Sequence, residues 1–307
     1  MRARELPPLV VSSMPDRPAV SIVVPAYDEE RRIERMLLEA LGYFRQRGRA
    51  VEILVVDDGS RDHTSGVVGR LARAWPELRL IRLAQNHGKG YAVRTGVVNA
   101  VGDSVLLADA DGATPIVELE RLEQALSLGN DVSVGSRAVS PDAGVHVERR
   151  WYRHVMGRTF HRLVETLAVK GVRDTQCGFK LFRGPVAHDL FSRMRMSGFS
   201  FDVEVLLMAQ RRGYRIAEVP INWVHQPGSK VNVVRDSFRM AADVIAIRAN
   251  CLRGEYDQPR VTPYSEMAAA LPAVNPTPSP QGRHGRTAAP LHHHSGLQRG
   301  RHPRGAG

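Results

Sequence analysis

The most constraining feature of the sequence is a regular alternation of apolar runs and helical patterns between about Val20 and Ser136. Each apolar run is short, as expected of a buried strand. The expected strands cover residues 20–25, 51–56, 78–83, 104–108 and 131–135, and the expected helices cover 29–47, 60–75, 88–101 and 115–128. Strands that alternate with helices form βαβ units. The sequence therefore predicts an α/β fold in which helices flank a mostly parallel central sheet.

The second half of the chain is less regular and predicts helical additions to this core. The helical segments are 151–170, 185–194, 202–212 and 234–253, and the extended segments are 176–183 and 216–223. Beyond about Arg260 the composition shifts to Pro, Gly, His and Arg, which predicts disorder. We therefore expect a flexible lead-in at 1–18, one folded domain at 19–255 with helical C-terminal additions, and a disordered basic tail at 256–307.

The formal net charge of +11 in a chain of 307 residues suggests an anionic partner. Nucleic acid, a phosphate-bearing substrate and an anionic membrane surface all satisfy this, and composition does not choose among them. No apolar run approaches the ~18 residues that a membrane span needs, and the N-terminus lacks the apolar core of a secretory signal. The two cysteines, Cys177 and Cys251, cannot form a disulfide framework or a zinc site of their own. We expect a cytoplasmic protein.

Acidic side chains follow three of the expected strands. The segments are Tyr27-Asp28-Glu29, Asp57-Asp58-Gly59-Ser60 and Asp109-Ala110-Asp111. Ligands of parallel sheets bind at the carboxyl ends of the strands. Two carboxylates at i and i+2, as in Asp109 and Asp111, can share one hard cation that also holds a diphosphate. Together the three segments predict a nucleotide-diphosphate site.

Each segment also has a purely structural interpretation. Tyr27 can stack on a base and Glu29 can accept from a ribose or base, or the acids can simply favour a helix N-terminus. Asp57 and Asp58 can accept from a nucleoside, or form a turn in which Ser60 caps the next helix.

Thr114 is a second candidate helix cap, with Pro115 at the first helical position.

The glycine-rich segment Asn86-His87-Gly88-Lys89-Gly90 precedes an expected helix, which suits phosphate binding, and Lys89 is its candidate phosphate contact. The segment lacks the GxxxxGK[ST] pattern of a P-loop and the GxGxxG pattern of a dinucleotide site. This argues against a nucleoside triphosphatase and against a dinucleotide-dependent oxidoreductase.

Several segments resemble those of family 2 glycosyltransferases, which have the GT-A fold. In chain order they are VSIVVPAYDEE, VEILVVDDGSRDHT, NHGKGYAVRTG and LLADADGAT. Further along, GSR (135–137), ERRWYRH (148–154), VKGVRDTQCGFKLF (169–182), FDVEVL (201–206) and GSK (228–230) resemble the dolichyl-phosphate β-glucosyltransferase group of that family. The resemblance covers roughly residues 20–253.

The resemblance implies an inverting transfer of glucose from UDP-glucose to dolichyl phosphate or another polyprenyl phosphate. A polyprenyl-phosphate mannosyltransferase that uses GDP-mannose is the nearest alternative. The implied metal ligands are Asp109 and Asp111, holding Mg²⁺ or Mn²⁺ against the diphosphate. The implied nucleoside contacts are Pro25, Tyr27, Glu29 and one or both of Asp57 and Asp58. Lys230 would close over the phosphates, and Arg137 and Arg153 would grip the acceptor phosphate, with Arg149 and Arg150 as weaker candidates.

A lipid acceptor requires contact with a membrane surface, at its inner face for a cytoplasmic protein. Trp151–Lys170 and Val234–Arg253 are candidate interfacial helices, although amphipathic helices also pack on domain cores. Two remote alternative functions rest on other features of the sequence. The D-x-D-G motif of residues 109–112 resembles the nucleophile loop of haloacid-dehalogenase-like phosphatases. The basic tail suggests a nucleic-acid-binding protein, but no recognisable binding module accompanies it, so we expect no nucleic-acid partner.

Overall fold

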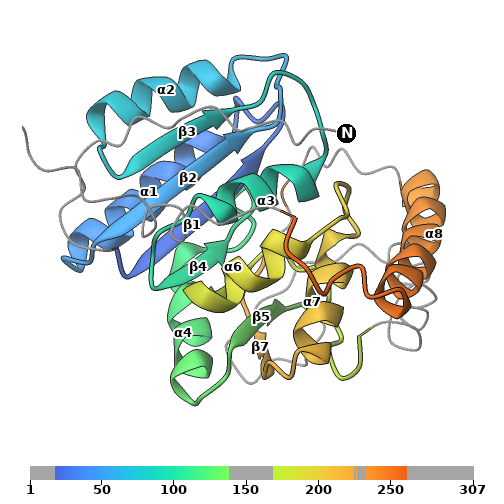
Figure 1. The fold of residues 1–307 in the computed structure, drawn as a ribbon. Helices are drawn as coiled ribbons and strands as arrows, with labels where there is room; N and C mark the ends of the chain where they lie inside the picture. The colour runs from blue at the N-terminus through green and yellow to red at the C-terminus, as the bar shows by residue number, and fades with distance from the viewer. Residues whose placement is uncertain (1–17, 138–168, 225, 227–232, 261–307) are drawn as a thin grey trace, which may run out of the picture. The chain divides into compact units, whose positions relative to one another are not determined.

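A seven-stranded mixed sheet, in the order β3-β2-β1-β4-β6-β5-β7, forms the centre of the fold (Figure 1). The computed structural model describes residues 18–137, 169–224, 226 and 233–260, all within a unit that spans Met1–Ala270. A second unit, Leu271–Gly307, lies outside the described residues. The strands are β1 (Val20–Ala26), β2 (Val51–Asp57), β3 (Leu78–Arg82), β4 (Ser104–Leu107), β5 (Val132–Ser136), β6 (Lys180–Arg183) and β7 (Ile216–Pro220).

The sheet is mostly parallel, which confirms the prediction from the sequence. β1 pairs in parallel with β2 and with β4, β2 pairs in parallel with β3, and β5 pairs in parallel with β7. β6 is the exception, because it runs antiparallel between β4 and β5. The segment that carries the DTQCGFKLF sequence is thereby inserted into the middle of the sheet, next to the strand that leads into Asp109.

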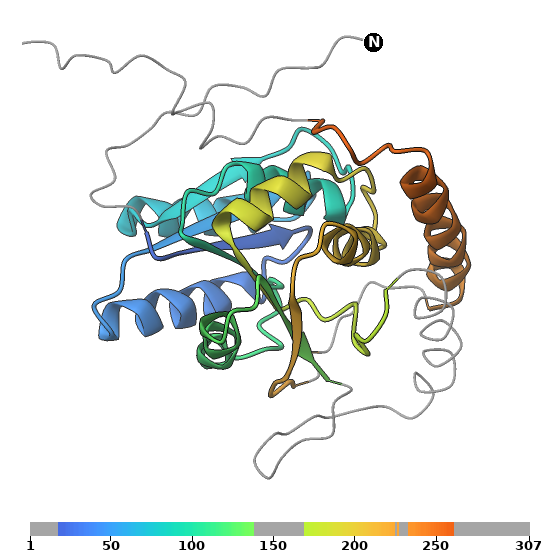
Figure 2. The same cartoon turned by 60° about the horizontal axis from the view of Figure 1, so that its bottom comes forward.

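The helices and the two faces of the sheet enclose two apolar cores. The helical elements are α1 (Ile33–Gln46), α2 (Thr64–Ala74), α3 (Lys89–Val98), the 3₁₀ helix η1 (Ile116–Glu118), α4 (Leu119–Ser127), α6 (Gly184–Arg193), α7 (Phe201–Arg211) and α8 (Val233–Leu252). One core joins the sheet to α1, α2 and α4, and the other joins it to α3, α6 and α7. Figure 2 shows α1 and α4 on one side of the sheet and α6 on the other.

Strand residues supply these two cores alternately, because successive side chains point to opposite faces of a sheet. In β1, Val23 belongs to the core with α3, whereas Ile22 and Val24 belong to the core with α1. Both faces are covered, which explains why the sequence shows continuous apolar runs rather than an apolar–polar alternation.

Three expected helix starts are wrong. Helix α1 begins at Ile33 rather than at Glu29. Helix α2 begins at Thr64 rather than after Ser60, because the Ser60 hydroxyl instead accepts a hydrogen bond from the backbone N–H of Asp28 at 2.9 Å. The expected helix at Pro115 begins with η1, and Pro115 itself has extended backbone with ψ of 139°. Long-range contacts of the loops thus displace the local capping signals.

Candidate active site

The three acidic segments meet at the carboxyl ends of β1, β2 and β4. Ala26 is in register with Asp57, and Val23 is in register with Leu107. The backbone N–H of Asp58 donates to the Ala26 carbonyl at 2.8 Å, which extends the β1–β2 ladder beyond the strand end. Since the strands are parallel, the polar residues that follow them share one edge of the sheet, as the sequence predicted.

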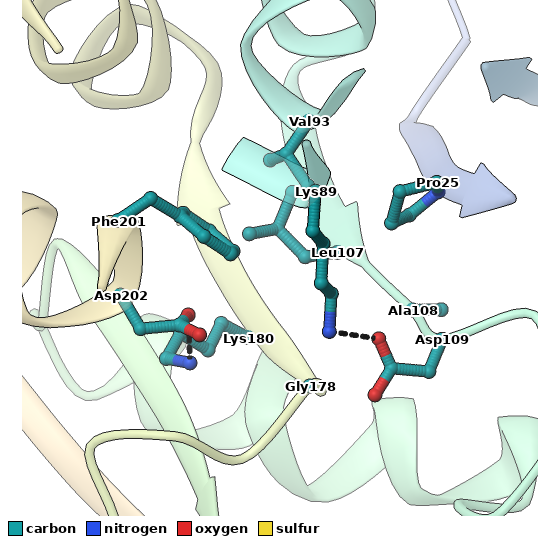
Figure 3. Close-up of a pocket in the computed structure, with 10 residues that line it drawn as sticks. All are labelled: Pro25, Lys89, Val93, Leu107, Ala108, Asp109, Gly178, Lys180, Phe201 and Asp202. Atoms are coloured by element: carbon teal, nitrogen blue, oxygen red, sulfur yellow. Dashed lines mark hydrogen bonds and ion pairs between the residues drawn. The ribbon is translucent and has the colours of Figure 1, made fainter. Parts of the chain in front are cut away.

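Lys89 and Asp109 form an ion pair at this edge, with Lys89 Nζ 2.6 Å from Asp109 Oδ1 (Figure 3). Lys89 is the first residue of α3, and Asp109 follows β4. Burial by itself would raise the pKa of Asp109, but the charge of Lys89 holds that pKa below its usual value. Burial would likewise lower the pKa of Lys89, yet Asp109 and Asp202 raise it. Both groups are therefore charged at neutral pH.

Asp111 lies beside this pair, and its pKa is shifted in the opposite direction to that of Asp109. Burial, followed by the negative charge of Asp109, raises the pKa of Asp111. One of its oxygens, Oδ1, accepts from the backbone N–H of Ala113 at 3.0 Å. Two neighbouring carboxylates that repel each other are stabilised by a shared cation.

The two carboxylates fit a divalent cation of the Mg²⁺ class. Such ions are usually held by one or two carboxylates together with substrate phosphates, rather than by a cage made of protein alone. Over the described residues, no group of three or more His, Cys, Asp or Glu side chains could hold a metal ion. Since the described residues offer no such group, the substrate and water are the expected sources of the remaining ligands at Asp109 and Asp111.

Gly178 closes one side of the Asp109 carboxylate. A Cβ atom built on Gly178 would lie 2.0 Å from Asp109 Oδ2, so a larger residue there would displace the carboxylate. Gly178 belongs to the DTQCGFKLF segment and leads into β6. This role of Gly178 was not predicted from the sequence, because nothing local in a Cys-Gly-Phe run shows which side chain the glycine faces.

Asp57 and Asp58 both accept hydrogen bonds within the chain. Asp57 accepts from the backbone N–H of Ser60 at 2.8 Å and from the Ser65 hydroxyl. Asp58 accepts from the backbone N–H groups of His87 and Gly88, each at 2.8 Å. The two carboxylates therefore fix the loops around the site, and their nucleoside contact stays a prediction.

The glycines of the Asn86–Gly90 segment allow a close approach to another loop. Gly88 has a φ of 102°, and a Cβ atom there would lie 2.4 Å from the carbonyl oxygen of Ser197. A Cβ atom on Gly90 would lie 2.6 Å from the carbonyl oxygen of Met196. Because the amides of His87 and Gly88 already donate to Asp58, Lys89 is the group of this segment that faces the site.

The end of β1 is also tied down by its neighbours. The Glu29 carboxylate pairs with Arg32 at 2.7 Å, and the Glu29 backbone N–H donates to the Thr64 hydroxyl at 2.7 Å. Pro25 lines the same cavity as Lys89 and Asp109, and Tyr27 is half-buried two residues further on. Pro25, one of the predicted nucleoside residues, thus lies in space beside Asp109, one of the predicted metal ligands.

A second ion pair, Lys180 with Asp202, lines the opposite side of this cavity (Figure 3). Lys180 Nζ lies 2.5 Å from Asp202 Oδ1 and donates to the carbonyl oxygen of Cys177 at 2.5 Å. Both residues are buried, and burial raises the pKa of Asp202. The cavity holds about 10 Å³, on the order of one water molecule. This pair was not predicted from the sequence, although a lysine in the apolar run FKLF is a signal for a buried acidic partner.

Arg137, at the end of β5, is held by Asp174. Its Nε and Nη2 donate to the Asp174 carboxylate at 2.7 and 2.8 Å, and its backbone N–H donates to the same group at 2.9 Å. The Trp223 ring lies 5.5 Å from the guanidinium carbon. Burial would raise the pKa of Asp174, but Arg137 lowers it below its usual value. The other predicted cationic residues lie outside the described residues: Arg149, Arg150, Arg153 and Lys230.

The chain matches glycosyl transferase family 2 over residues 21–191. The dolichyl-phosphate beta-glucosyltransferase of Dictyostelium discoideum is 37% identical over 262 residues, which cover 81% of this chain and 80% of that protein. The human protein of the same name is 39% identical and covers 77% of each chain. These matches confirm the resemblance seen in the sequence and favour a glycosyltransferase over a phosphatase.

Solved structures show the same fold at lower identity. Mannosyl-3-phosphoglycerate synthase from Rubrobacter xylanophilus is 20% identical, with a TM-score of 0.58 over 78% of this chain and 76% of that chain. Glucosyl-3-phosphoglycerate synthase from Mycobacterium tuberculosis, in complex with UDP, is 20% identical, with a TM-score of 0.55 over 79% and 81%. The GT-A fold inferred from the sequence is thereby confirmed. The chain is a glycosyltransferase and belongs to glycosyl transferase family 2.

Proposed function

We propose that this glycosyltransferase moves glucose from UDP-glucose to dolichyl phosphate or another polyprenyl phosphate. The relatives at 35–40% identity carry the name dolichyl-phosphate beta-glucosyltransferase. The observation that carries the proposal is the contact of Gly178 with Asp109. Through this contact, the DTQCGFKLF segment forms part of the wall of the acidic site. This segment carries much of the resemblance to the dolichyl-phosphate β-glucosyltransferase group.

The donor side of the reaction uses the edge formed by β1, β2 and β4. Asp109 and Asp111 would hold Mg²⁺ or Mn²⁺, and the related synthase from Mycobacterium tuberculosis has been crystallised with Mn²⁺ and UDP. When bound, the cation would neutralise charge on the departing diphosphate. The Lys89 ammonium, already at this carboxylate, adds a second positive charge for the same diphosphate. Pro25, Tyr27 and Glu29 are the nucleoside contacts in this proposal.

The acceptor side of the reaction uses Arg137. A guanidinium group presents a planar fork that suits phosphate, and Asp174 fixes the orientation of this fork. The acceptor phosphate is already largely anionic at neutral pH, so its oxygen can attack the anomeric carbon without a strong general base. One displacement opposite the leaving UDP inverts the anomeric centre and gives a β-linked lipid product. Arg153 and Lys230 stay part of the proposal as further phosphate contacts.

The lipid must be reached at a membrane surface. In the described part of the chain, no helix is long and apolar enough to cross a membrane. Helix α8 lies at the edge of the described fold (Figure 1) and exposes 62% of Ile245 and 71% of Leu252. Arg248, on the same helix, is exposed as well, whereas Val244 and Ile247 are buried against the core. Exposed apolar side chains next to a basic residue suit the surface of an anionic membrane, which supports peripheral binding at its inner face.

The experiment that tests this function is a transfer assay on the full chain. Polyprenyl phosphate is offered with UDP-glucose or GDP-mannose in separate reactions, each with and without Mg²⁺ or Mn²⁺. Metal-dependent glucosyl transfer is the expected result. Transfer from GDP-mannose alone would show that the chain is a mannosyltransferase. Transfer from neither donor would show that polyprenyl phosphate is not the acceptor.

A further inference from the structure

Glu218, on strand β7, binds the two segments that hold Arg137 in place. Its Oε1 accepts from the Ser136 hydroxyl at 2.7 Å and from the backbone N–H of Asp174 at 2.9 Å. The backbone N–H of Arg173 donates to both carboxylate oxygens at 3.1 Å. Because β7 pairs with β5 in parallel and Glu218 is in register with Val134, Glu218 stands two residues before Ser136, the last residue of β5.

These contacts form a continuous path of hydrogen bonds to the Arg137 guanidinium. Glu218 fixes the backbone at Asp174, and the Asp174 carboxylate then accepts three hydrogen bonds from Arg137. Glu218 also fixes Ser136, the residue directly before Arg137. The arginine is therefore constrained from its own strand and from its carboxylate partner at once.

We infer that Glu218 is a positioning residue for the acceptor phosphate. It acts through Asp174 to orient the phosphate-binding edge of Arg137, and this inference rests on the proposed role of Arg137. Removal of the Glu218 carboxylate leaves two backbone N–H groups and one hydroxyl without their acceptor. The loop at Arg173 and Asp174 then moves, and a shift of about 1 Å in a positioning group is enough to impair transfer strongly.

The chain offers a matched control in Glu52. Its carboxylate also accepts from a serine hydroxyl, Ser21 Oγ at 2.5 Å, and from a backbone N–H, that of Val101 at 3.1 Å. Ser21, however, lies near the start of β1, at the opposite end of that strand from the acidic site. Glu52 also pairs with Arg79, so its substitution disturbs a buried polar cluster at least as strongly bound, without touching the path from Glu218 to Arg137.

The experiment compares Glu218→Ala, Glu218→Gln and Glu218→Asp with Glu52→Gln. The first readout is the KM for polyprenyl phosphate and, separately, the KM for UDP-glucose. The second needs no substrate: the Nε–Hε resonance of Arg137 in ¹H–¹⁵N NMR, assigned by its loss in Arg137→Lys. Glu218→Asp serves in place of Glu218→Ala if the alanine variant does not fold, because it keeps the charge but shortens the reach.

Glu218→Ala is expected to raise the acceptor KM by about tenfold, leave the donor KM within about twofold, and shift or broaden the Arg137 resonance. Glu218→Gln keeps one acceptor oxygen, so its acceptor KM and its Arg137 resonance are expected to lie close to those of the wild type. An unchanged Arg137 resonance in Glu218→Ala, or an equal change in Glu52→Gln, would overturn the inference. If the wild-type chain transfers nothing to polyprenyl phosphate, the proposed function fails, and the NMR readout still decides whether Glu218 positions Arg137.

Discussion

Lys89 places its ammonium nitrogen 2.6 Å from the Asp109 carboxylate, across the junction between α3 and the end of β4. This pair joins the glycine-rich segment to the acidic motif and puts a positive charge where a diphosphate would bind. The two residues are 20 positions apart in the sequence. Helix α3 packs against β1, and β4 pairs in parallel with β1, so the start of α3 and the end of β4 meet at one edge of the sheet.

Replacement of Lys89 by Met is expected to lower the transfer rate on the order of 100-fold, because the site loses a preorganised positive charge. It also changes the response to pH. In the wild type the depressed pKa of Asp109 contributes stability that is present above about pH 4 and is lost as the pH falls. Without Lys89, burial raises this pKa, so the acid limb of the activity profile moves to higher pH. A pH–rate profile measures the shift, and Lys170→Met, at an exposed lysine, is the control.

Replacement of Asp111 by Asn is expected to lower metal-dependent transfer by at least about 100-fold, because one of the two carboxylates available to the cation is lost. Calorimetric titration with UDP, with and without Mn²⁺, checks the cause: the variant should lose the increase in affinity that Mn²⁺ gives. Asp103→Asn, at the far end of β4, should behave like the wild type. If Asp111→Asn kept full metal dependence, the metal assignment would be wrong.

Replacement of Gly178 by Ala is expected to reduce transfer by about 100-fold while the chain still folds, because the new Cβ displaces the Asp109 carboxylate. The measurement pairs the transfer rate with a thermal melt. Gly69→Ala is the matched control, since a Cβ at that helical position meets nothing within 4 Å. Equal activity in the two variants would show that Gly178 does not shape the site.

Replacement of Lys180 by Met is expected to lower the free energy of unfolding by about 3–5 kcal/mol, because Asp202 is left as a buried charge without its partner. The double variant Lys180→Met with Asp202→Leu should recover much of this loss, since both charges are then gone. Urea unfolding of the two variants and the wild type measures the difference. A double variant less stable than Lys180→Met would contradict this account of the pair.

Much of the fold follows from local pattern. The apolar runs that became β1, β2 and β4 are continuous because both faces of the sheet are covered, and the acids after them are grouped because parallel strands end together. Asp109 and Asp111 could therefore be identified as a candidate site from the sequence. The antiparallel position of β6 could not, because the pairing of Leu106 with Leu181 joins residues far apart in the chain.

The contacts that complete the site also depend on this long-range pairing. Gly178 faces Asp109 only because β6 lies beside β4, and Lys180 reaches Asp202 only across the gap between β6 and α7. Ser60 is a further example. Its position in the sequence suggests a helix cap, but its hydroxyl instead accepts a hydrogen bond from the backbone N–H of Asp28, which is distant in the sequence. Local propensity is a weak guide wherever a tertiary partner competes for the same group.

A competition between the two donors tests whether this chain transfers glucose to a polyprenyl phosphate. The full chain is incubated with polyprenyl phosphate, UDP-[¹³C₆]glucose, unlabelled GDP-mannose and Mn²⁺, and the lipid product is weighed by mass spectrometry. Glucose and mannose have the same mass, so the isotope label identifies the donor. We expect a single lipid-phosphate hexose that carries the label and that is no longer formed when Mn²⁺ is chelated. An unlabelled product, or no lipid-linked hexose, would contradict this expectation.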